Sequence, residues 1–134
     1  MTRRLLPTLA SLLFLAAPAL ADEMWAATGG GMVIYEQDAG DTAILSFPKG
    51  AASARLYIPG LVGKLDSRDV HQAYWIGAPE GTCGATLTGP DGWAGSDWGL
   101  ATVAFDAAGF PSGFTATLGS CTSAPFMSLR ASVP

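Results

Sequence analysis

Alternation of apolar and polar residues is the dominant pattern of this chain. It is clearest near the carboxyl end, where residues 127–133 place Met, Leu, Ala and Val at every second position, with Ser, Arg and Ser between them. A period of two puts the apolar side chains on one face of an extended segment, as in a strand with one buried face. The pattern therefore predicts a half-buried β-strand over 127–133.

Similar runs recur along the chain at short intervals, separated by Gly-, Pro- and Asp-containing turns. We expect the 82–88 strand to pair with the 100–105 strand, hairpin loops at 38–41 and 106–109, and one helical turn at 65–69. The further predicted strands are 24–28, 32–37, 42–47, 55–58, 70–76 and 114–121.

Glycine and proline make long helices unfavourable almost everywhere. The chain has 17 Gly and 9 Pro, and each costs about 1 and 3 kcal/mol, respectively, in a helix interior. The predicted fold is all-β: a small antiparallel β-barrel or β-sandwich of seven to nine short strands. The barrel is favoured, because in a sandwich the last strand would be an exposed edge.

The first 21 residues have the three parts of a secretory signal peptide. Arg3 and Arg4 precede an apolar run over 5–21 that ends in Ala-Leu-Ala, and two acidic residues follow at once. The run is shorter than the roughly 20 residues that a membrane-spanning helix needs, and it contains two prolines. We expect cleavage after Ala21, no membrane span afterwards, and a single domain over 22–134 in the periplasm or outside the cell.

The charge balance bears on the choice of partner. Without the leader the chain keeps five Lys and Arg against all eleven Asp and Glu, a formal charge of −6. Nucleic-acid binding requires clustered basic residues, so no nucleic-acid partner is expected. The balance is compatible with a cationic partner, although acidity also keeps an exported domain in solution.

Cys83 and Cys121 are the only cysteines, and in an exported chain they predict one disulfide. We expect it to join two strands of the carboxy-terminal sheet, worth roughly 4 kcal/mol by loop closure. Cys121 has the opposite parity to Phe114 and Leu118, which predicts a bulge at Gly119 or a strand that ends before Cys121. With a single histidine, His71, no zinc site and no cofactor is expected.

The 89–99 loop contains the candidate binding residues. It is longer than ordinary hairpin loops, and long loops are often functional. Its indoles could stack on a sugar ring or anchor a protein partner, with the neighbouring oxygens accepting hydrogen bonds; alternatively, both indoles fold inward and cover an open end of the sheet. Three oxygen-bearing side chains are too few for calcium. The candidate ligand-binding residues are Trp93, Trp98, Asp91, Asp97 and Ser96.

Two enzymatic patterns are weaker. Ser67, Asp69 and His71 have the residue types of a nucleophilic triad, but triads usually join distant segments, and no Gly-x-Ser-x-Gly elbow is present. A carboxylate pair for glycoside hydrolysis cannot be singled out among eleven acids. A solvated turn with an Arg68 ion pair is the preferred interpretation of the first pattern.

In outline, the leader, small β-domain and single disulfide resemble the periplasmic lysozyme inhibitors, with no inhibitory motif to assign residues. The expected function is that of an exported, soluble binding module whose partner is a cationic envelope protein or a glycan. The alternatives are a small hydrolase dependent on carboxylates or His71, and a structural component of an envelope assembly. No feature of the sequence indicates an oligomeric state.

Overall fold

The computed structural model describes residues 23–61 and 68–134, and within these residues the chain is built of β-strands and turns. The predicted leader and most of the predicted helical turn at 65–69 lie outside the described residues. The strands are β1 (Met24–Ala27), β2 (Met32–Ala39), β3 (Thr42–Lys49), β4 (Ala52–Pro59), β5 (Val70–Ile76), β6 (Leu87–Thr88), β7 (Ala94–Gly95), β8 (Trp98–Phe105), β9 (Phe114–Gly119) and β10 (Pro125–Ser132).

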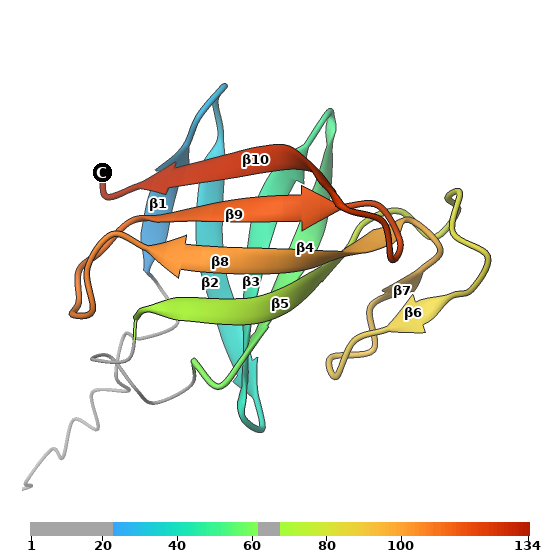
Figure 1. Cartoon of the computed structure of the whole chain (residues 1–134), viewed down its shortest axis with the longest axis horizontal. Coiled ribbons are helices and arrows are strands. Elements are labelled where there is room, and N and C mark those ends of the chain that lie inside the picture. Colours follow the sequence, from blue (N-terminus) through green and yellow to red (C-terminus); the bar gives the residue numbers. More distant parts are fainter. Residues whose placement is uncertain (1–22, 62–67) are drawn as a thin grey trace, which may run out of the picture.

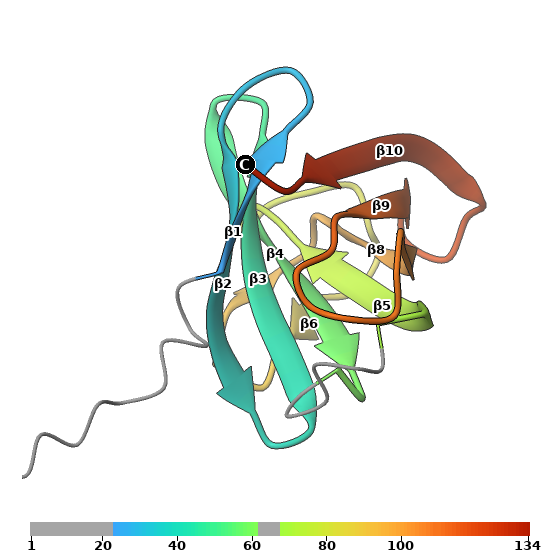
Figure 2. The same ribbon diagram turned by 90° about the vertical axis from the view of Figure 1, so that its left-hand side faces the viewer.

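Eight of these strands close into an antiparallel barrel in the order β1-β10-β9-β8-β5-β4-β3-β2. Strands β1 to β4 form one side of the barrel, and β5, β8, β9 and β10 cross them on the other side (Figures 1 and 2). This confirms the all-β prediction and the preference for a barrel. Closure gives the last strand, β10, a partner on each side, β9 and β1, so it is not an exposed edge.

The first hairpins turn more tightly than the sequence suggested. Ala39 pairs with Thr42, so that only Gly40 and Asp41 form the turn, and Lys49 pairs with Ala52 in the same way. Gly40 and Gly50 have φ values of 60° and 61°, a conformation that glycine adopts without a steric penalty. The predicted loop at 38–41 was therefore too long by two residues.

Alternate side chains of the eight strands fill the barrel. Large aromatic groups lie toward its ends, where Trp25 contacts Phe114 at the start of β9 and Trp75 donates a 2.8 Å hydrogen bond to the carbonyl of Gly119 at the end of β9. The interior also contains many small side chains, since every barrel strand except β2 contributes a buried alanine. These alanines are Ala27, Ala43, Ala54, Ala73, Ala101, Ala116 and Ala131.

The predicted pairing of 82–88 with 100–105 is wrong. Strand β8 instead lies between β5 and β9, with seven residue pairs to β5. Residues 82–85 form bends, and only Leu87–Thr88 is extended, paired with β7 in a separate two-stranded sheet. The reason is that Cys83 lies outside the barrel wall, where it is bonded to Cys121. The segment around Cys83 is therefore not part of a long strand ladder.

Two further boundaries differ from the predictions. The connection after β8 runs over 106–113 instead of ending at 109, and β10 begins at Pro125, two residues early, with an irregularity between Pro125 and Met127. The parity argument is confirmed: β9 ends at Gly119, and Cys121 has a φ of 54° in a single bridge to Gly99.

Membrane-spanning helices were sought among residues 23–61 and 68–134, and none is long and apolar enough to cross a bilayer.

Candidate functional site

Residues 77–97 leave the barrel between β5 and β8 and fold back beside it; we call them the excursion (Figure 1). The excursion contains β6 and β7 and packs on outward-facing side chains of the barrel wall. Ile44, Tyr57 and Ile76 are fully buried there, although they point away from the barrel interior. Leu87, Trp93 and Trp98 pack against them, so that the protein has a second, smaller apolar cluster outside the barrel.

Asp91 anchors the tip of the excursion to the wall. Its Oδ1 accepts a 2.8 Å hydrogen bond from the Tyr57 hydroxyl and a 3.2 Å bond from the Trp93 amide, and Oδ2 lies 3.6 Å from an Arg55 nitrogen. Only 6% of the Asp91 side chain is exposed. The carboxylate is therefore committed to holding the tip in place.

Trp93 belongs to the same anchor. Its indole nitrogen donates a 3.0 Å hydrogen bond to the carbonyl of Gly77, and the Arg55 guanidinium lies 4.6 Å from its ring centre. Both the polar edge and one face of the indole are thus engaged within the chain. Trp93 matches the inward-folded alternative considered for the loop tryptophans.

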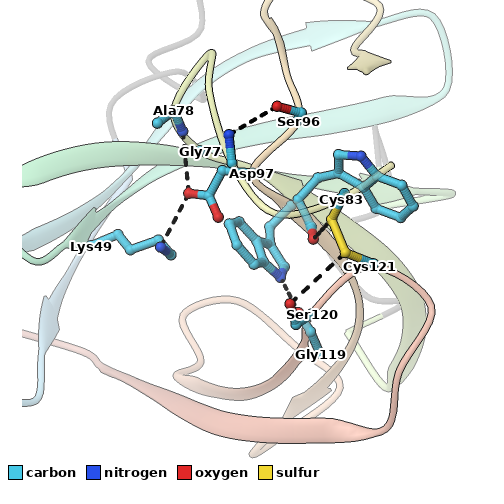
Figure 3. Close-up of polar contacts among 12 residues, drawn as sticks. Lys49, Gly77, Ala78, Cys83, Ser96, Asp97, Gly119, Ser120 and Cys121 are labelled. Carbon is cyan, nitrogen blue, oxygen red and sulfur yellow. Dashed lines mark hydrogen bonds and ion pairs between the residues drawn. A yellow bond between two sulfur atoms is a disulfide. The ribbon is translucent and has the colours of Figure 1, made fainter. Parts of the chain in front are cut away.

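Ser96 and Asp97 hold the base of the excursion (Figure 3). The Ser96 hydroxyl accepts from the Gly81 amide at 2.9 Å and donates to the carbonyl of Pro79 at 3.2 Å. Asp97 Oδ2 lies 3.1 Å from Lys49 Nζ and accepts from the Ala78 amide at 3.3 Å. These two residues, both predicted to bind a ligand, instead hold the base of the excursion in place.

The predicted disulfide is present and joins Cys83 to Cys121, with their Cα atoms 5.5 Å apart. The sequence predicted that the bridge joins two strands of one sheet, and this part of the prediction is wrong. The disulfide connects the excursion to the turn that follows β9, because Cys83 lies among bends and Cys121 forms only one bridge. The Cys121 amide also donates a 2.7 Å bond to the carbonyl of Trp98, which holds that turn against the start of β8.

A pocket of about 320 Å³ opens between these two cross-linked segments. Its floor is the outer face of β5 and β8, with Trp98 and Leu100 two residues apart on β8. The excursion forms one side, and Thr122, next to Cys121, forms the other. The lining residues are Tyr74, Leu87, Thr88, Trp98, Leu100 and Thr122.

Trp98 is the candidate residue that lines this pocket. Its indole nitrogen donates a 2.8 Å bond to the carbonyl of Ala85, which fixes the ring against the excursion while one surface remains in the pocket. Leu100 is 51% exposed beside it. Together the two side chains form an apolar surface in the pocket.

Tyr74, which lines the pocket, stacks on the fully buried Tyr57. The Tyr57 and Tyr74 rings lie 4.8 Å apart and nearly parallel. Burial, and then the bond to Asp91, raises the pKa of the Tyr57 hydroxyl; burial, and then the Asp91 charge, raises that of Tyr74. Both phenols therefore stay neutral at physiological pH, which suits an apolar site.

A smaller hollow of about 160 Å³ also borders Leu100. It is lined by Gln72, Leu100, Ala101, Thr102, Ser123 and Pro125, a more polar set than that of the first pocket. Leu100 thus stands as a ridge between two depressions.

Of the five predicted ligand-binding residues, the structure places Trp98 in the pocket and the other four in contacts that hold the excursion. The other lining residues, Tyr74, Leu87, Thr88, Leu100 and Thr122, were not among the predicted site residues. The spacing of Leu100 was the sequence signal that could have identified it. Leu100 lies two residues after Trp98 on the same strand, so both side chains are on the same, outward face.

The residues of the triad pattern lie elsewhere. His71 Nε2 is 3.2 Å from Asp69 Oδ1 beside the start of β5, and Ser67 lies outside the described residues. Within 23–61 and 68–134, no group of three or more His, Cys, Asp or Glu residues could hold a metal ion.

No family model, curated protein or solved structure matches this chain at a significant level. The fold and the geometry of the pocket are therefore the basis for a functional proposal.

Proposed function

We propose that this protein is an exported binding module whose pocket takes an apolar side chain of a protein partner. The observation that carries the proposal is the pocket of about 320 Å³ between the excursion and the Cys121 turn. Its size is at the lower end of ligand sites, roughly 300 to 1,000 Å³, and suits a side chain better than a large cofactor. The predicted leader and the disulfide support an exported location.

The lining favours a protein side chain over a glycan. Sugar recognition combines an aromatic face with polar groups that bind the hydroxyls, and Asp91 and Asp97 were the expected acceptors. Asp91 is engaged by Tyr57 and Arg55, and Asp97 by Lys49. An aliphatic or aromatic group requires no such partners and gains from the removal of apolar surface from water.

Charge favours a basic partner. Each of the four described Lys and Arg residues, Lys49, Arg55, Arg68 and Arg130, lies within 4 Å of a carboxylate. The ion pairs so formed leave the acidic surplus of the chain uncompensated. Such a surplus attracts cationic proteins and raises their association rate, while the pocket provides the apolar anchor.

Site-specific photo-crosslinking tests the proposal. A benzophenone amino acid at position 100 places the reactive group on the ridge beside the pocket, and the same group at Phe126, 65% exposed and outside the pocket lining, is the control. Irradiation of cells that export each variant should give an adduct from position 100 that is absent from position 126, and mass spectrometry should identify peptides of a second protein in it.

An adduct that contains glycan and no second polypeptide would replace the protein partner with a sugar. Equal labelling from positions 100 and 126, or no labelling, would contradict a partner at this pocket. A Thr88→Tyr substitution, which adds bulk to the pocket lining, should reduce the adduct from position 100 if the pocket itself is occupied.

A further inference from the structure

A buried arginine lies at the barrel end opposite Trp75, outside the proposed side-chain pocket. Arg68 precedes β5, and its amide donates a 3.0 Å bond to the carbonyl of Ala108 in the connection between β8 and β9. Only 2% of its surface is exposed. An arginine this deeply buried requires partners that satisfy its charge and its five N–H groups.

Three aromatic rings surround the guanidinium. Its central carbon lies 6.0 Å from the Trp25 ring, 5.4 Å from Phe105 and 5.1 Å from Phe110. The rings come from β1, the end of β8 and the following connection. They stabilise the cation through their faces and exclude water, which strengthens any ion pair formed there.

Glu23 occupies the open side of this aromatic enclosure. Arg68 Nη1 donates to one carboxylate oxygen of Glu23 at 2.8 Å, and Nη2 donates to the other oxygen, a bidentate arrangement. The carbonyl of Glu23 accepts a 2.9 Å bond from the Tyr35 amide, which positions the residue just before β1. The Glu23 side chain is 12% exposed, so the enclosure reaches solvent on this side.

The enclosure offers more hydrogen bonds than Glu23 uses. Arg68 Nε and the hydroxyl of Ser112 are both buried without a partner among the described residues. Ser112 is 4% exposed, and its carbonyl accepts the Trp25 indole bond at 2.9 Å. Buried polar groups are rarely left unpaired, and the free Nε of Arg68 leaves the guanidinium one donor that Glu23 does not use.

We propose that Arg68, with Trp25, Phe105 and Phe110, forms a carboxylate-binding socket, and that Glu23 is its tethered, exchangeable ligand. Glu23 lies two residues after the predicted leader cleavage point. The strand it precedes, β1, makes two residue pairs with β10 and three with β2. The socket adds a side-chain attachment to these pairs, and it accepts a free carboxylate when Glu23 is withdrawn.

Chemical rescue of Glu23→Ala tests the socket. The urea midpoint of this variant should rise as acetate replaces chloride at constant ionic strength, because acetate binds the folded state alone. The wild type, whose socket is filled, should respond equally to both salts. Asp106→Ala is the matched control, because Asp106 makes the same bidentate pair with Arg130 on the exposed surface and should show no acetate-specific rise.

The double variant Glu23→Ala/Arg68→Gln should lose the acetate response. If Glu23→Ala is unfolded in chloride, refolding measured by circular dichroism replaces the midpoint, and recovery in acetate but not in chloride supports the socket. Equal behaviour of Glu23→Ala in the two salts, folded or unfolded, or an equal acetate response in Asp106→Ala, overturns the proposal.

Discussion

The hydroxyl of Tyr57, on the outer face of β4, donates a 2.8 Å hydrogen bond to Asp91 at the tip of the excursion. With the Arg55–Asp91 and Lys49–Asp97 ion pairs, this contact joins the barrel wall to a segment whose Leu87 and Trp93 pack on the outer apolar cluster. The excursion is thereby a fixed wall of the pocket. Its attachments can be tested one at a time.

Replacing Asp91 by Ala should loosen the tip. The change leaves the Tyr57 hydroxyl unpaired in a buried position and removes the carboxylate beside Arg55, so we expect a loss of roughly 2–3 kcal/mol in the free energy of unfolding. Urea unfolding measures the loss. Glu80→Ala removes an exposed acid from the same excursion and should cost under about 0.5 kcal/mol; similar losses in the two variants would contradict the anchoring role.

Alkaline pH should destabilise the protein through its buried phenols. Burial and carboxylate partners raise the pKa of Tyr57 and Tyr35 above their usual value. Above pH ~10 the unfolded chain therefore loses phenolic protons that the folded chain keeps, and stability falls as pH rises. Urea midpoints across this range should fall less steeply in Tyr57→Phe than in the wild type. Identical slopes would show that Tyr57 ionises alike in both states.

Removal of the disulfide should separate the two walls of the pocket. In Cys83→Ser/Cys121→Ser, we expect the barrel to persist by circular dichroism, with a loss of roughly 4 kcal/mol for a loop of this length. Thiol titration of the unfolded, unreduced wild type should find no free thiol. Two reactive thiols, or an unchanged free energy of unfolding in the double variant, would contradict the bridge.

Gly99 lies against the end of β9. A Cβ atom at this position would be 1.8 Å from the carbonyl oxygen of Gly119, a backbone atom that cannot rotate away. Gly99→Ala should therefore cost about 3 kcal/mol or more. Gly84→Ala, where a Cβ would meet nothing within 4 Å, is the matched control and should be nearly neutral in thermal unfolding. Equal melting temperatures would contradict this packing.

Much of the barrel follows from local sequence signals. Alternation located β2, β3, β5 and β10, because each has one face against the interior, and turn residues located the β2–β3 hairpin, although its turn is tighter than predicted. Parity at Cys121 predicted either a bulge at Gly119 or a strand that ends before Cys121, and β9 ends at Gly119. What failed was the pairing of distant segments: the 82–88 alternation resembles a half-buried strand whether its apolar face meets the barrel interior or the outside of another strand.

The candidate site shows the same limit. Trp98 was predicted and lines the pocket, but Asp91, Trp93, Ser96 and Asp97 hold the excursion in place. Loop composition cannot separate these roles, because Asp and Trp serve both recognition and internal anchoring. Arg55 and Lys49, which engage the loop carboxylates, come from strands more than 35 residues earlier, and their proximity depends on the tertiary fold.

The most direct test of the side-chain pocket is a titration of ¹⁵N-labelled protein with N-acetyl-leucine amide, followed by amide and indole chemical shifts. The account predicts progressive shifts at the Trp98 indole and at Leu100 and Thr122, with little change on the β2–β3 hairpin. The same titration of Leu100→Ser should give weaker binding, and Phe126→Ser should bind as the wild type does. Shifts that avoid the pocket, or equal binding by Leu100→Ser and wild type, would contradict a side-chain site beside Trp98.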